Sequence, residues 1–203
     1  EQEAADPDFP TTLFPNPEEQ GVLDLAIKYA QENAADLIIA NDPDADRCAV
    51  AINDINLGWK MLTGDQVGSI IGSYLISKNQ SANAQVANSL VSSSLLSKIA
   101  AKHNLTHKET LTGFKWISKV ENLIFGYEEA LGYCIDPTNV NDKDGISAAL
   151  IIAQIAADLK KQGTTINDYL AQLGQEFGFH STEQISIRYA KLDLIGQTLN
   201  KVA

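Results

Sequence analysis

The sequence has 203 residues, 44% of them hydrophobic and 20% charged, which is typical of a globular protein with one large or two modest domains. Its net charge of −11 argues against nucleic acid or an anionic membrane as a partner, because both bind through clustered Lys and Arg. No apolar run approaches the roughly 18 residues of a membrane span. Cys48 and Cys134 lack the number and spacing of a disulfide framework or a zinc site, so we predict buried thiols in a cytoplasmic protein.

The first part of the chain predicts half of an α/β domain. Prolines and turn residues over 6–17 indicate an extended segment. A helical apolar stripe follows over 22–30, then a short buried strand at 37–40 and an apolar run at 48–52 that we predict to be its hairpin partner. The turn residues at 53–56 predict a boundary.

The strand at 37–40 stops at three carboxylates on alternating positions, Asp42, Asp44 and Asp46, with Arg47 directly after them. On a curved loop their oxygen atoms can turn toward one point, and three like charges that close require a cation. Oxygen ligands suit Mg²⁺, Mn²⁺ or Ca²⁺, whereas zinc prefers His or Cys. A loop at the carboxyl end of a parallel strand is also where open α/β sheets place ligands.

Three other interpretations of this loop are weaker. A solvated acidic turn accounts for any two of the carboxylates more easily than for all three. An EF-hand loop starting at Asp42 needs Gly at its sixth position and Glu at its twelfth, where the sequence has Arg47 and Asn53. A phosphatase of the haloacid dehalogenase type also ends a strand in Asp-x-Asp, but has Thr or Val where Asp46 stands.

From Trp59 on, predicted strands and helices alternate. The helices begin at polar caps, and a buried helix follows Asp144 with apolar residues almost all round. The predicted elements are a helix capped by Thr63, a strand at 85–87, a helix at 94–102 capped by Ser92–Ser94, the buried helix at 146–158, a helix capped by Thr164 or Thr165, a strand at 185–189 and a helix at 192–202.

Two further loops carry polar side chains after predicted strands. The first runs through Gly113 into a helix start, which places Lys115 on the loop side. The second follows the buried strand 123–125 and contains Glu128 among glycines. Carboxylates accept strong hydrogen bonds from sugar hydroxyl groups, and glycines let a ring approach the backbone. Taken alone, each loop is better explained as an exposed turn with a solvated charge.

Together the three loops resemble those of one family. Asn41–Arg47 resembles the metal-binding loop of the α-D-phosphohexomutases, the phosphoglucomutase and phosphomannomutase superfamily. Thr112–Trp116 is close to the phosphoglucomutase-2-like, phosphopentomutase-like branch, and Gly126–Tyr133 resembles the family's sugar-binding loop. The loops occur in the family's order, and the resemblance covers nearly the whole chain. Ala130 stands where the common pattern has Ser, which leaves the identity of the sugar open.

The resemblance implies an α/β fold of two α/β/α sandwich units with mostly parallel sheets, the first incomplete. Residues 1–56 would belong to the second domain of the family, 57–180 would form the third, and 181–203 a linker and the start of the fourth. Asp42, Asp44 and Asp46 would hold Mg²⁺, and Arg47 and Lys115 would act on the phosphate and the reacting hydroxyl. The implied substrate contacts are Thr112, Gly113, Lys115, Gly126, Glu128 and Ala130.

The implied reaction moves a phosphoryl group between the 1 and 6 (or 5) positions of a hexose or pentose phosphate such as glucose 1-phosphate. It passes through a phosphoserine and a sugar bisphosphate intermediate. The family's Thr-Ala-Ser-His-Asn-Pro type loop and terminal phosphate-binding loop do not occur in this sequence, so we predict a fragment with no activity of its own. The alternatives are a non-catalytic binding module for metal or sugar phosphate and, less favoured, a metal-dependent phosphatase.

Overall fold

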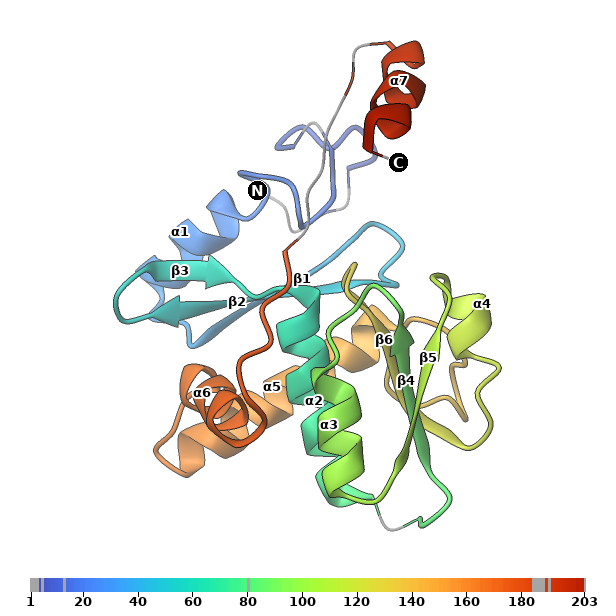
Figure 1. Cartoon of the computed structure of the whole chain (residues 1–203). Helices are drawn as coiled ribbons and strands as arrows, with labels where there is room; N and C mark the ends of the chain where they lie inside the picture. The colour runs from blue at the N-terminus through green and yellow to red at the C-terminus, as the bar shows by residue number, and fades with distance from the viewer. Residues whose placement is uncertain are drawn as a thin grey trace.

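The computed structural model of the chain describes residues 4, 6–12, 14–79, 81–183, 189 and 191–202. This part contains two sheets with the strand orders β1-β2-β3 and β5-β4-β6-β7. Helices lie between and around the sheets (Figure 1). The predicted α/β class is therefore confirmed.

The first sheet is antiparallel. It consists of β1 (Leu37–Asn41), β2 (Cys48–Asp54) and β3 (Gly58–Met61), with α1 (Asp24–Glu32) packed on it through Ala30 and Ile38. The predicted helix and hairpin partner are confirmed, but β1 has no parallel neighbour among the described residues, and the turn after Asp54 lies inside this sheet. The loop at 42–47 is too short for the crossover connection that parallel neighbours need.

The second sheet is mostly parallel, as predicted. β4 (Gln85–Ser89) pairs in parallel with β5 (Thr106–Thr110) and β6 (Leu123–Glu128), while β7 (Gly132–Cys134) runs antiparallel to β6. The prediction ended this strand at Phe125, which is wrong, because β6 continues through Glu128. Its last residues are held in the ladder by β7 across a short turn.

The helices begin at the caps that the sequence indicates, with one exception. Thr63 and Gln66 form a capping box, Asp144 accepts hydrogen bonds from two backbone N–H groups, and Thr165 caps the helix that begins at Ile166. Of the serines predicted to cap α3 (Leu95–Lys102), Ser94 makes no side-chain cap, whereas Ser93 Oγ accepts a hydrogen bond from Leu95 N–H at 3.2 Å. The helices that follow α1 in the chain are α2 (Gly64–Lys78), α3 (Leu95–Lys102), α4 (Phe114–Ile117), α5 (Gly145–Lys161), α6 (Ile166–Phe177) and α7 (Asp193–Val202).

Two features of the C-terminal part bear on the remaining predictions. The strand expected at 185–189 falls outside the described residues except for Tyr189, whereas the last helix is confirmed as α7.

Among the described helices, none has the length and apolarity that crossing a membrane requires.

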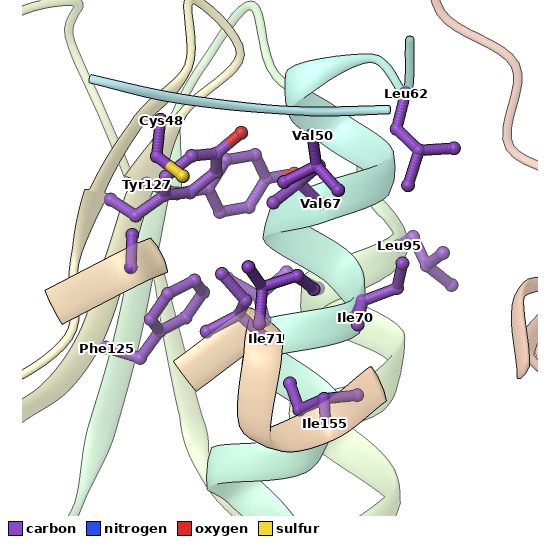
Figure 2. Packing of buried hydrophobic residues seen from close by; sticks show 14 of the residues in the cluster. Cys48, Val50, Leu62, Val67, Ile70, Ile71, Leu95, Phe125, Tyr127 and Ile155 are labelled. Carbon is purple, nitrogen blue, oxygen red and sulfur yellow. The ribbon is translucent and has the colours of Figure 1, made fainter. Parts of the chain in front are cut away.

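One hydrophobic core joins the two sheets. Figure 2 shows Val50 of β2, Val67 and Ile71 of α2 and Phe125 of β6 packed in one cluster. Helix α2 approaches β6 closely because it carries glycines on the contact face: a Cβ on Gly68 would lie 2.5 Å from the Tyr127 ring. The loop between β1 and β2 and the turn between β6 and β7 are thereby held beside each other.

Helix α5 differs from its predicted burial. Ala148, Ile152 and Ile155 face the core, but Ile146 is 68% exposed and Leu150 is 75% exposed. The helix packs along one side of β1, β2, β7 and α2, so only one of its faces meets a partner in the described chain.

Both cysteine thiols are free and buried, as predicted. Burial raises the pKa of Cys48 and of Cys134 to about 12, so both thiols stay protonated at neutral pH and are poor nucleophiles.

Candidate functional site

The three aspartates gather at the end of β1. A turn closed by the hydrogen bond from Ala45 N to Asp42 O at 3.0 Å curves the loop, and Ala45 has the left-handed φ of 58° that this bend needs. One carboxylate oxygen of each of Asp42, Asp44 and Asp46 lies within 4.8 Å of the other two. Asp42 is buried, Asp46 is half-buried and Asp44 is exposed, so the cluster opens toward solvent on one side.

These residues fit a hard divalent cation. Mg²⁺ binds oxygen at about 2.1 Å, which places neighbouring ligand atoms about 3 Å apart and opposite ones about 4.2 Å apart. The separations of up to 4.8 Å in the loop therefore need only a small contraction. All three donors are carboxylates, the ligand type that Mg²⁺ and Mn²⁺ prefer.

Arg47 is fixed by the loop itself. Its Nε donates to Asp42 Oδ2 at 2.6 Å and its backbone N–H donates to Asp42 Oδ1 at 3.0 Å. Burial alone would raise the pKa of Asp42, but these hydrogen bonds outweigh it and hold the pKa below its usual value. Asp42 is thus ionised at neutral pH, and both of its oxygens already accept hydrogen bonds.

The N-terminal segment supplies two more partners of Arg47. Its Nη1 donates to Asn16 Oδ1 at 3.3 Å and lies 3.8 Å from Glu18 Oε2. Burial raises the pKa of Glu18, and the attraction of Arg47 offsets only part of that increase. The guanidinium group therefore bonds a residue that lies 31 positions earlier in the sequence, and it holds the N-terminal segment against the loop.

Glu128 stands at the end of β6, half-buried, and its Oε1 accepts a hydrogen bond from the backbone N–H of Gly113. Gly113 has a φ of 106°, which a side chain would strain. The predicted Gly113 turn and the predicted sugar loop are thus in direct contact. Ala130 follows on the exposed tip of the turn, whereas Gly126 is buried, where a Cβ would lie 2.4 Å from Ile117 Cγ2. This packing explains Gly126 without a substrate.

Backbone hydrogen bonds join the aspartate loop, residues 42–47, to the sugar loop, residues 126–133. Cys48 N–H donates to Leu131 O at 3.0 Å, and Arg47 forms a bridge with Gly132. Gly145, at the start of α5, completes the junction by donating its N–H to Ala45 O at 3.0 Å. The loops that the sequence places about 80 residues apart therefore form one surface.

Two predicted residues lie at the edge of this surface. Thr112 and Lys115 are exposed, and the Lys115 ammonium lies 5.7 Å from the centroid of the Trp116 ring. Within the described residues, Lys115 makes no hydrogen bond or ion pair with the aspartates or with Glu128. Hollows of about 590 and 430 Å³ lie elsewhere, and none of the predicted site residues lines them.

The structure adds residues that the sequence did not single out. Lys143 Nζ lies 2.8 Å from Asp46 Oδ2, so it contacts one member of the aspartate cluster. Its only signal in the sequence is a position next to the helix cap Asp144. In the sugar loop, Glu129 Oε2 accepts hydrogen bonds from Ser89 and Ser92 at 2.9 and 2.8 Å. Ser92 therefore holds the sugar loop and does not cap α3.

Comparison with known proteins agrees with this arrangement. A family model described as phosphoglucomutase/phosphomannomutase, alpha/beta/alpha domain III, matches residues 63–177, and the corresponding domain II model matches residues 1–58. A Haemophilus influenzae protein named "Probable phosphomannomutase" is 53% identical over 191 residues, which is 94% of this chain and 39% of that protein. Phosphopentomutase from Homo sapiens is 40% identical over 200 residues, covering 90% of this chain and 32% of that protein.

Solved structures extend the similarity. The open form of parafusin, a phosphoglucomutase from Paramecium, matches with a TM-score of 0.65 and 26% identity over 81% of this chain and 30% of that one. The chain spans 39% and 32% of the two curated relatives described above. A family model that covers more than half of the residues, together with relatives at 40–53% identity, shows that the chain belongs to the phosphoglucomutase/phosphomannomutase family.

Proposed function

We propose that this chain carries the metal and sugar sites of a mutase that moves a phosphoryl group between the 1 and 6 (or 5) positions of a hexose or pentose phosphate. The observation that supports it most strongly is the contact between the aspartate loop and the sugar loop, where Cys48 N–H donates to Leu131 O. A metal site beside carboxylates suited to sugar hydroxyls is what phosphoryl transfer to a sugar requires.

Each residue group has a distinct part in the proposed site. Asp42, Asp44 and Asp46 would hold Mg²⁺, which when bound offsets negative charge on the transferring phosphoryl group. Glu128 accepts hydrogen bonds from sugar hydroxyls through the oxygen that Gly113 leaves free. Arg47, held by Asp42 and Asn16, keeps positive charge at the rim of the loop for phosphate oxygens.

The proposed phosphoryl donor is a phosphoserine outside these residues. No Thr-Ala-Ser-His-Asn-Pro type loop occurs in the 203 residues, and both buried thiols are protonated. By themselves, then, these residues would act as a binding module for metal and sugar phosphate, and turnover belongs to the complete protein. We also propose a cytoplasmic location, which the two unpaired buried cysteines support.

Asp44→Asn tests the metal part of this proposal. In the complete protein we expect kcat to fall by about a hundredfold or more, because one anionic ligand of the metal is lost at constant size. Asp54→Asn is the matched control, since Asp54 pairs with Lys60 at the β2–β3 turn and lies outside the cluster. A coupled mutase assay at saturating Mg²⁺ gives the result, and equal rates for both variants would contradict the assignment.

A further inference from the structure

Lys143 is the one lysine that the structure places in contact with the aspartate cluster among the residues it describes. Its Nζ lies 2.8 Å from Asp46 Oδ2 and 3.7 Å from Asp142 Oδ1. The ammonium also lies 5.4 Å from the centroid of the Phe114 ring. A Cβ on Gly132 would lie 2.4 Å from Lys143 Cδ, so the lysine stem runs directly over that glycine.

These contacts belong to all three loops of the site. Asp46 is in the aspartate loop, Phe114 follows the Gly113 turn, and Gly132 ends the sugar loop. Lys143 is also close enough to Glu128 for an electrostatic interaction. Its side chain is 25% exposed, so both its charge and its apolar stem lie partly out of water.

We propose that Lys143 is the resident counter-cation of the aspartate loop, which a divalent ion must displace from Asp46 in order to bind. This inference rests on the metal site of the proposed function. The ammonium pairs with a carboxylate that the ion would use, and its charge repels the ion at short range. Arg47 pairs with Asp42 and Lys143 pairs with Asp46, so these two cations offset part of the charge of the three carboxylates until the ion replaces Lys143.

The displacement couples the metal to the sugar site. When the ammonium leaves Asp46, its position beside the Phe114 ring changes as well, since the same Nζ atom makes both contacts. Metal binding therefore alters the wall next to Glu128. Because coupling between two sites is reciprocal, a sugar phosphate that draws Lys143 toward itself favours metal binding.

The test is Mn²⁺ titration of the 203-residue chain, followed by electron paramagnetic resonance of the free ion. We expect weak binding by the wild-type chain and about tenfold tighter binding by Lys143→Met, because removal of a neighbouring unit charge has that effect on a divalent ion. Lys143→Arg keeps the charge and should stay near wild type. Lys119→Met is the control, because Lys119 is exposed and its ammonium lies 4.9 Å from the centroid of the Trp116 ring, with no ion pair to the aspartates among the described residues.

Thermal unfolding supplies a second readout. Without Mn²⁺, Lys143→Met should have a lower Tm than the wild-type chain, because the carboxylates lose their counter-cation, and it should gain more Tm on addition of Mn²⁺. A lysine that merely packs the loop would lower both Tm values equally. Gly132→Ala provides an independent variant that displaces the lysine stem without removing the charge, and it should also tighten Mn²⁺ binding.

The outcomes separate this inference from the function on which it rests. Unchanged or weaker Mn²⁺ binding in both Lys143→Met and Gly132→Ala would overturn the counter-cation role while leaving the metal site intact. Equal binding by wild type and Asp44→Asn would overturn the metal site itself, and the role of Lys143 with it.

Discussion

Glu128→Ala in the complete protein is expected to lower kcat/KM for a sugar phosphate by about a hundredfold. Each sugar hydroxyl left without its acceptor in a buried site costs about 1–3 kcal/mol, and a carboxylate has room for more than one such hydroxyl. The position of Glu128 at the end of β6, next to the backbone of the aspartate loop, makes it the carboxylate best placed for this contact.

The matched control is Glu121→Ala, which removes an exposed carboxylate just before the same strand. Glu128→Gln adds a further comparison, because its amide oxygen can still accept the hydrogen bond from Gly113 while the charge is lost. Steady-state kinetics of the three variants give the result. If Glu128→Ala matched Glu121→Ala, the loop would be a turn with no part in sugar binding.

Gly145→Ala is expected to lower the free energy of unfolding by about 3 kcal/mol. A Cβ at this position would lie 2.3 Å from Arg47 O, 2.5 Å from Asn41 Nδ2 and 2.7 Å from Ala45 O. Two of these atoms are backbone, so the start of α5 and the aspartate loop would have to move apart. The hydrogen bond from Gly145 N–H to Ala45 O would be lost in that movement.

Gly196→Ala is the control for this substitution. Gly196 is exposed in α7, and a Cβ there would meet no described atom within 4 Å outside its own stretch of helix, so alanine should be neutral or stabilise the helix by up to about 1 kcal/mol. Urea unfolding of the two variants measures the difference. Similar stabilities would show that the junction between α5 and the aspartate loop tolerates expansion and does not fix the loop.

Local signals in the sequence predicted most of the elements. Thr63 and Asp144 cap helices because their side chains meet backbone N–H groups within three residues, and such signals can be identified without the rest of the fold. The alternation of apolar runs with loops also predicted the α/β class. The three aspartates were predicted to converge because they lie within five residues of each other.

The features that the sequence did not predict depend on contacts between residues far apart in the chain. Lys143 reaches Asp46 only because α5 begins beside the aspartate loop, and Asn16 reaches Arg47 from 31 residues away. Ile146 and Leu150 indicated a buried helix, but burial depends on whether a partner covers that face, which helical spacing does not reveal. The end of β6 was misplaced because its ladder partner comes after the turn.

The most direct test of the central claim compares the complete protein with the isolated 203 residues in a coupled mutase assay. Glucose 1-phosphate and a pentose 1-phosphate serve as substrates, with a sugar 1,6-bisphosphate as activator. We expect turnover of at least one substrate by the complete protein and none by the isolated residues, since metal and sugar binding do not replace a phosphoryl donor held in line with the acceptor. Turnover by the isolated residues, abolished by Asp44→Ala, would contradict this account and place a nucleophile within them.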